Sequence, residues 1–125
     1  MTVYLDTHVL VWIAKGEDHQ LSSNAREAIE NDDLLVSPAV VLELELLHEI
    51  GRLRASAEKT LSFLETEIGL CACTIPFHEI VKHALHEKWT RDPFDRLIVA
   101  NAKAASAPLI TKDERLRKHY RRAIW

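Results

Sequence analysis

Short segments rich in β-branched and large apolar residues alternate along the chain with longer segments of helical pattern. The β-rich segments are two to five residues long: Thr2–Leu5, Leu34–Val36, Cys71–Ile75, Leu109–Ile110 and Ala123–Trp125. Helical segments of about eight to fifteen residues separate them. Because parallel strands need a long crossover connection, usually a helix, this alternation predicts an α/β fold with a parallel sheet.

Glycine and proline mark the ends of the helical segments. Each glycine follows such a segment, at the position where a positive φ is favoured: Gly16, Gly51 and Gly69. Three prolines are predicted at the first position of a helix, where the missing N–H has no cost: Pro38, Pro76 and Pro93. Local chemistry therefore predicts where most helices begin and end.

The chain has the length and composition of one packed domain. It has 125 residues, 47% of them apolar, and no Ser/Gly-rich linker or internal repeat divides it. We therefore expect a single domain over residues 1–125. The net charge of −3 is unevenly distributed, because residues 112–125 hold six basic and two acidic residues after an acidic body. This distribution is a weak indication of a polyanionic partner.

Several features favour a reducing compartment. Cys71 and Cys73 would point to opposite faces of a strand, so we expect reduced thiols and no mutual disulfide. The first residues lack the basic region of a signal peptide, and the apolar run Pro38–Leu42 is far shorter than a membrane span. We therefore expect a soluble, cytoplasmic protein.

Two acidic residues occupy unusual positions. Asp6 directly follows Thr2–Leu5, where it would either cap the next helix or take part in a metal or phosphate site. Glu43 falls between Leu47 and Ile50 on a helical wheel, on the apolar side of its helix. A carboxylate there must be protonated, neutralised or paired with a cation, unless it reaches water from the edge of the apolar face.

Three further aspartates lie at predicted helix starts. Asp92 precedes a proline and is suited to an N-cap, whereas Asp95 would lie in the first turn, near the positive end of the helix. Thr111 and Glu114 have the spacing of a capping box, which would leave Asp113 without a capping role.

Four of these five carboxylates are the best candidates for a shared site. They are those of Asp6, Glu43, Asp95 and Asp113. Gathered in one pocket of low dielectric, they would repel each other strongly. A hard divalent cation with remaining water ligands, Mg²⁺ or Mn²⁺, would make the cluster tolerable. Phosphodiester hydrolysis uses this arrangement, because the cation produces a nucleophilic water and offsets charge on the phosphoryl oxygens.

Four motifs resemble, in their order and spacing, the motif series of PIN domains, and in particular of the VapC ribonuclease toxins of bacterial toxin–antitoxin pairs. They are the segment from Leu5-Asp6-Thr7-His8 to Trp12, Ser37–Leu44, Asp92-Pro93-Phe94-Asp95-Arg96, and Leu109–Asp113. The likeness runs from residue 2 to the terminal Ile124-Trp125. It implies a three-layer α/β/α sandwich with a central parallel sheet. It also implies an endoribonuclease that depends on Mg²⁺, for which Mn²⁺ can substitute, and that hydrolyses RNA with a metal-activated water.

The resemblance implies roles for particular residues. The catalytic acids would be Asp6, Glu43, Asp95 and Asp113, with Asp6, Asp95 and Asp113 as metal ligands. Supporting roles fall to Thr7, Asp92 and Thr111, and RNA phosphates could be held by Arg96, Lys112 and Arg115. Relatives often carry a histidine two residues before the Asp-Pro step, where this chain has Thr90 after Trp89. This departure argues against histidine-assisted handling of the substrate.

The partners implied by the resemblance are an RNA substrate, an antitoxin that covers the acidic groove, and a second copy in a homodimer. A stand-alone PIN-type RNA-processing nuclease and a catalytically inert PIN-like scaffold remain as alternatives. A haloacid-dehalogenase-type phosphatase is excluded, because His8 stands where its second aspartate would be. A receiver domain is excluded because no acid follows Cys71–Ile75. The nuclease interpretation requires Asp6 and Asp95 to lie near each other, and Glu43 not to be paired with an arginine.

Overall fold

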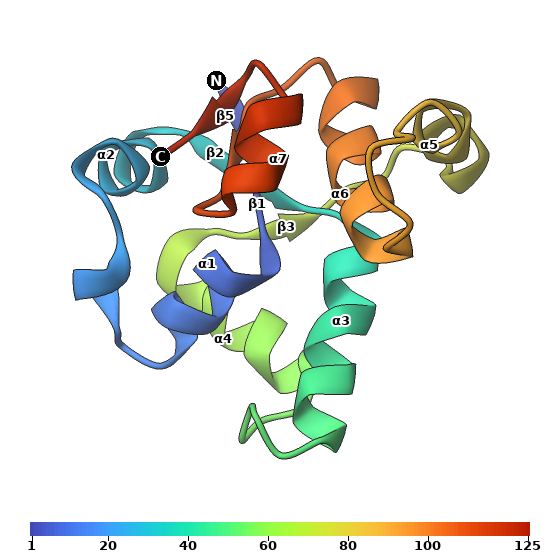
Figure 1. Cartoon of the computed structure of the whole chain (residues 1–125). Helices are drawn as coiled ribbons and strands as arrows, with labels where there is room; N and C mark the ends of the chain where they lie inside the picture. The colour runs from blue at the N-terminus through green and yellow to red at the C-terminus, as the bar shows by residue number, and fades with distance from the viewer.

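A computed structural model describes all of residues 1–125. A parallel sheet of five strands lies at its centre, in the order β3-β2-β1-β4-β5. The strands are β1 (Thr2–Leu5), β2 (Asp33–Val36), β3 (Cys71–Ala72), β4 (Leu109–Ile110) and β5 (Ala123–Ile124). The helices are α1 (Thr7–Ala14), α2 (Ser23–Asn31), α3 (Pro38–Glu49), α4 (Ala57–Ile68), α5 (Phe77–Ala84), α6 (Pro93–Ala104) and α7 (Glu114–His119), with a 3₁₀ turn η1 (Asp18–Gln20). The helices flank the sheet (Figure 1), so the predicted α/β/α fold with a parallel sheet is confirmed.

The order of the strands creates a switch point between β1 and β4. The first half of the chain adds β2 and then β3 on one side of β1, and the chain then crosses to β4 on the other side. Tyr4 of β1 is opposite Leu35 of β2 and Leu109 of β4, so β1 is paired along both edges. In open parallel sheets, ligands bind beyond the carboxyl ends of the strands at such a point. The fold therefore directs attention to the residues that follow β1 and β4.

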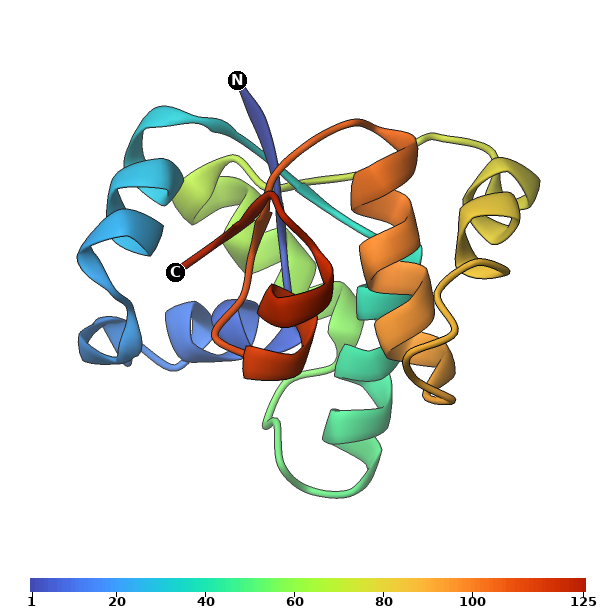
Figure 2. The ribbon, with the colours of Figure 1, turned by 45° about the horizontal axis from the view of Figure 1, so that its top comes forward.

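The core is built around β1. Val3, Tyr4 and Leu5 are all almost completely buried, as expected for a central parallel strand that is covered on both faces. α6 packs against both α3 and α5, and these three helices lie together on the right in Figure 2. α6 leads into the start of β4 and therefore runs in the direction opposite to the strands. Its first turn consequently lies at the same edge of the sheet as the ends of β1 and β4.

Two predicted boundaries near residue 75 are wrong. The strand predicted over Cys71–Ile75 ends at Ala72, because the Cys73 thiol accepts hydrogen bonds from the Tyr4 hydroxyl (2.9 Å) and the Ile75 N–H (3.4 Å), which turn the chain out of the sheet. Pro76 is the N-cap of α5 and not its first residue. The positions predicted for Pro38 and Pro93 are confirmed, since both begin a helix.

Other local predictions hold. Gly69 ends α4 in the left-handed conformation, with a φ of 69° that permits its N–H to donate to the last carbonyls of the helix. Both cysteines are free, Cys71 exposed and Cys73 buried. None of the helices combines the length and the hydropathy that a membrane crossing requires.

Candidate active site

Asp6 is fixed between β1 and β4. Its backbone N–H donates to the carbonyl of Ile110 (3.0 Å), and its side chain is only 5% exposed. One carboxylate oxygen accepts the Thr7 N–H (2.8 Å), which caps α1, and the other accepts the Thr111 hydroxyl (2.7 Å). Both readings of Asp6 are thus compatible, because the N-cap of α1 lies at the switch point of the sheet.

Glu43 faces the same place from α3. Its Oε1 accepts a hydrogen bond from the Thr7 hydroxyl, and it forms no ion pair with an arginine. Thr7 therefore joins the two acids, since its N–H bonds to Asp6 and its hydroxyl bonds to Glu43. This contact explains how a glutamate is accommodated on the apolar side of α3.

Asp95 lies in the first turn of α6, and the pKa of its carboxyl is raised. Burial is the largest cause that raises the pKa of its carboxyl to about 6, and the negative charges of Asp92, Asp6, Asp113 and Glu43 add to the effect. The five carboxylates therefore lie close enough to repel one another. Asp6 and Asp95, which the nuclease interpretation requires to be neighbours, are within this group.

Asp92 and Asp113 each cap a helix. The Asp92 carboxylate accepts the Phe94 N–H (2.8 Å) at the start of α6, as predicted. The Asp113 carboxylate accepts the N–H groups of Arg115 (2.8 Å) and Leu116 (3.0 Å) at the start of α7.

The predicted capping box of Thr111 and Glu114 is therefore wrong. The Thr111 hydroxyl donates to Asp6 and accepts the Asp113 N–H (3.1 Å), so it is not available to cap the helix. α7 consequently begins at Glu114, with Asp113 as its cap. The spacing of a capping box occurs in the sequence, but a tertiary contact uses the hydroxyl.

Burial and like charges raise the pKa of Asp6 and Glu43 as well. For Asp6, burial is the largest cause, and the hydrogen bonds from Thr111 and Thr7 oppose it. For Glu43, burial is again the largest cause, the Thr7 hydroxyl opposes it and the charge of Asp6 adds to it. His8 also opposes the shift at both acids, so it lies near them, although sequence analysis gave it no role. Its position in the first turn of α1, two residues after Asp6, was the available signal.

The donor set fits a hard divalent cation. Asp6, Asp95 and Asp113 offer carboxylate oxygens, and a cation would offset the repulsion that raises the pKa of Asp95. No three His, Cys, Asp or Glu side chains in the structure are arranged to hold one metal ion. Mg²⁺ is commonly held by only one or two carboxylates, with water as the other ligands. That all three aspartates bind the ion therefore stays a prediction.

The three predicted RNA-binding cations differ in their contacts. Arg96 donates from Nε to the carbonyl of Thr90 (2.8 Å), and Arg115 donates to the carbonyl of Trp89. Both guanidinium groups are thus tied to the segment before α6. Lys112 is exposed, with its ammonium 5.7 Å from the ring centroid of Trp12. Lys112 is therefore the most accessible of the three for contact with a phosphate.

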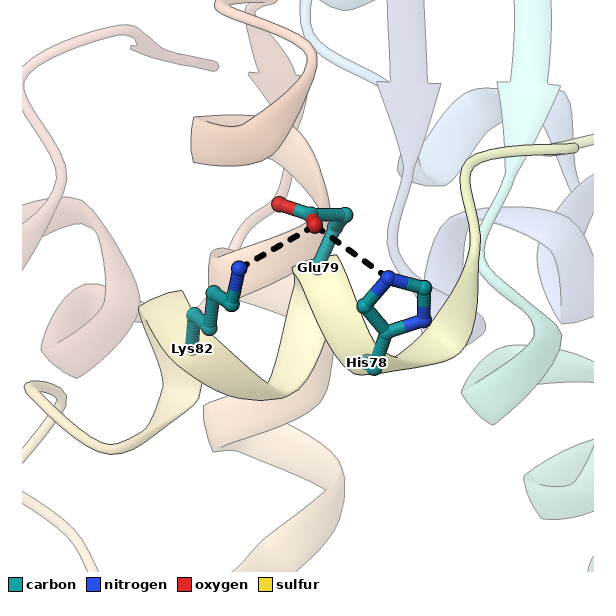
Figure 3. Close-up of polar contacts among 3 residues, drawn as sticks. All are labelled: His78, Glu79 and Lys82. Atoms are coloured by element: carbon teal, nitrogen blue, oxygen red, sulfur yellow. Dashed lines mark hydrogen bonds and ion pairs between the residues drawn. The ribbon is translucent and has the colours of Figure 1, made fainter.

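His78 and His83 of α5 and His86, which follows that helix, are not arranged around one metal ion. His78 lies 3.2 Å from the carboxylate of Glu79, which Lys82 also approaches to 3.2 Å (Figure 3). His83 and His86 are exposed, and no group arranged to hold a metal includes them.

The acidic cluster is separate from the largest cavity. That cavity, of about 700 Å³, lies between the end of α1 and the turn that joins α3 to α4, and its basic lining residues are Lys15, Arg52, Arg54 and Lys59. None of the five clustered acids lines it. Asp6 and Asp113 lie instead just beyond the carboxyl ends of β1 and β4.

Comparisons with known proteins agree with this architecture. The model of the PIN domain family matches residues 3–122. The chain is 38% identical over 121 residues to ribonuclease VapC22 of Mycobacterium tuberculosis (strain ATCC 25618 / H37Rv), an alignment that covers 94% of this chain and 92% of that protein.

Two solved structures have a similar fold. The structure of VapBC2 from Rickettsia felis, bound to a DNA fragment from its promoter, superimposes with a TM-score of 0.70 at 16% identity, covering 98% of this chain and 96% of the matched chain. VapBC-1 from nontypeable Haemophilus influenzae gives a TM-score of 0.57 at 20% identity, with coverages of 94% and 91%. With the family match over most of the chain and the relationship to VapC22 over nearly all of it, this protein belongs to the PIN-domain family and is one of its VapC-type members.

Proposed function

We propose that this protein is a metal-dependent endoribonuclease, the toxin component of a toxin–antitoxin pair, formed by a single domain over residues 1–125. The observation that carries the proposal is the convergence of five carboxylates at the switch point, where burial and then the charges of the other four acids raise the pKa of Asp95 to about 6. A site built to repel its own charges is suited to hold a divalent cation beside a phosphodiester. The relationship to a protein named as a ribonuclease supports RNA as the substrate.

Asp6, Asp95 and Asp113 would hold the cation. Asp6 is oriented for this by Thr7 and Thr111, which leave its carboxylate little freedom to rotate. Mg²⁺, or Mn²⁺ in its place, supplies a water of lowered pKa and offsets negative charge on the phosphoryl oxygens. The fixed carboxylate of Asp6 would reduce the reorganisation that binding would otherwise need.

Glu43 is suited to a proton transfer. Its pKa is raised by burial, and its Oε1 is oriented by the Thr7 hydroxyl. A carboxylate with a raised pKa accepts a proton more readily than an ordinary glutamate, which favours it as the base for the attacking water. In-line attack by water, with departure of the 3′-oxygen, would leave 5′-phosphate and 3′-hydroxyl ends.

An antitoxin is the proposed protein partner. Two solved structures with a similar fold are of VapBC proteins, and this chain is similar to them over more than nine-tenths of its length. The free thiols of Cys71 and Cys73 fit action in the reducing cytoplasm. The stand-alone RNA-processing nuclease differs from the toxin in having no such partner. A small neighbouring gene whose product binds this chain on co-expression would therefore distinguish the two.

A homodimer is the proposed assembly. An apolar groove lies where α3, α5 and α6 meet, and no charged residue lines it. Leu42 and Phe77, which line this groove, are each 56% exposed, and Leu46 and Ile50 continue the exposed apolar face of α3. An uncharged surface meets its own copy without repulsion, as a two-fold interface requires.

The test is RNA cleavage by the purified chain with and without a chelator. We expect cleavage in Mg²⁺ or Mn²⁺, loss of cleavage in excess EDTA, and 5′-phosphate products. Cleavage that persists in EDTA, or 2′,3′-cyclic phosphate products, would indicate attack by the RNA's own 2′-hydroxyl and contradict the proposal. A folded chain that cuts no RNA with any divalent cation would favour the inert scaffold.

A further inference from the structure

The segment Glu87–Thr90, between α5 and α6, is held more firmly than a surface loop requires. Glu87 is 2% exposed and Thr90 is 3% exposed. One oxygen of Glu87 accepts the indole N–H of Trp89 (2.7 Å), and the other makes no contact besides its ion pair with Lys103 of α6. A buried carboxylate with two partners of this kind fixes the indole ring in one orientation.

The fixed indole ring packs against α7. It stacks on the imidazole of His119, with ring centroids 4.8 Å apart and planes 6° from parallel. The guanidinium carbon of Arg115 lies 5.5 Å from the Trp89 ring centroid, and Arg115 also donates to the Trp89 carbonyl. Arg115 and His119 are four residues apart and so lie on one face of the helix. Trp89 therefore joins α7 to the segment before α6.

The connection made by Trp89 ends at two aspartates that cap helices, Asp92 of α6 and Asp113 of α7. Thr90 accepts the Asp92 N–H on its hydroxyl (3.1 Å) and the Arg96 Nε–H on its carbonyl (2.8 Å), which ties the segment to the first turn of α6. At the other end, the Arg115 N–H donates to the Asp113 carboxylate (2.8 Å). No hydrogen bond or ion pair joins the Asp92 or Asp95 side chain to Asp113 directly.

We propose that Trp89 is a positioning residue that sets the separation between the Asp92–Asp95 turn and Asp113. The inference rests on the proposed function, since the separation matters because a cation would bind between these acids. Repulsion among the carboxylates pushes the two turns apart, and the Trp89 connection opposes it. The role of Trp89 is to hold the site without touching the substrate.

The experiment compares Trp89→Ala and Trp89→Phe with the parent chain and with Phe63→Ala. Phe63 is a half-exposed aromatic residue of α4 that lines the cavity separate from the acids, so its removal controls for the loss of a ring. Mn²⁺ affinity is measured by titration calorimetry, and protection of the Phe94, Arg115 and Leu116 amides by hydrogen exchange without metal. Steady-state cleavage gives kcat and KM.

We expect Trp89→Ala to weaken Mn²⁺ binding about tenfold, the lower end of the range for groups that orient metal ligands. It should lower kcat with little change in KM, and reduce amide protection at both caps. Trp89→Phe keeps a ring to stack on His119 and should recover part of each loss, and it serves if Trp89→Ala does not fold. Phe63→Ala should match the parent.

Unchanged Mn²⁺ affinity and unchanged cap protection in a folded Trp89→Ala would overturn the inference. Equal losses in Phe63→Ala would reduce Trp89 to a general contribution to stability, which also overturns it. If the parent chain binds no Mn²⁺, the proposed function fails, whereas the exchange data still decide whether Trp89 couples the two caps.

Discussion

At the scale of single residues, the site is a group of carboxylates that the fold holds against their mutual repulsion. Asp6 is buried, with both oxygens occupied by Thr7 and Thr111. Asp95 has no such partners, and burial, followed by the charges of the neighbouring acids, raises its pKa. The two residues therefore allow two different tests, one of catalysis and one of stability.

Asp6→Asn should abolish cleavage and preserve the fold. The amide can still accept the Thr7 N–H and can donate to the Thr111 hydroxyl, so the free energy of unfolding should change by less than about 1 kcal/mol. The lost ligand charge should lower cleavage by more than about a hundredfold. Gel assays of RNA cleavage and urea unfolding measure the two effects. A folded variant with full activity would contradict the assignment of Asp6.

Asp95→Asn should stabilise the metal-free protein at neutral pH. The pKa of Asp95 is about 6 in the folded state, against 3.8 for the ordinary carboxyl, so the folded state keeps its proton while the unfolded state loses it. The parent chain therefore loses stability as pH rises from about 4 to 6, whereas the asparagine variant avoids this loss.

The difference in unfolding free energy should grow over this window and then level off at roughly 1–2 kcal/mol in favour of the variant, since solvent screens part of the repulsion. Urea unfolding in EDTA at several pH values measures it. Mg²⁺ at pH 7.5 should stabilise the parent more than the variant. A difference that falls with rising pH would contradict the direction of the pKa shift.

At the scale of elements, three helices begin at one edge of the sheet, and each is capped by an aspartate. Asp6 caps α1, Asp92 caps α6 and Asp113 caps α7. The N-termini of these helices carry partial positive charge, which stabilises the carboxylates that face them. The same residues thus serve local structure and the candidate site.

Asp92 allows the capping role to be separated from any part in cleavage. Asp92→Ser keeps an oxygen for the Phe94 N–H, whereas Asp92→Ala removes it. We expect the alanine variant to lose about 1 kcal/mol of unfolding free energy and the serine variant to lose only a few tenths. Both should still cut RNA, because Asp92 is exposed and directed at the helix N–H groups. A serine variant as inactive as Asp6→Asn would make Asp92 a direct member of the site.

At the scale of the whole molecule, the proposed dimer can be disrupted without touching the acids. Leu42→Glu introduces a charge into the apolar groove between α3, α5 and α6, where two copies would place it in a desolvated interface. We expect sedimentation to give two chains for the parent and one for this variant. Phe63→Glu introduces the same charge at an exposed position of α4, and this variant should remain dimeric. A parent chain that sediments as a monomer would exclude the dimer.

Much of the fold could be predicted because it follows from local rules. The bounds of β1 and β4 and the starts of α3 and α6 follow from short-range patterns, and the structure confirms them. The fold class follows from the order of the elements and the right-handed crossover. The prediction failed at Cys73, where a thiol hydrogen bond from Tyr4, 69 residues away, ends β3 early.

The types and order of the elements and the four acidic motifs follow from the sequence alone, because propensity, capping and hydrophobic period act over a few residues. Which hydroxyl bonds to which acid was settled by the tertiary structure. Thr111 bonds to Asp6 across 105 residues of chain, so Asp113 takes the cap that the local spacing assigned to Thr111. It likewise decided that Arg96 and Arg115 bond to the segment before α6. Such contacts depend on the distances between folded elements, and no local pattern encodes them.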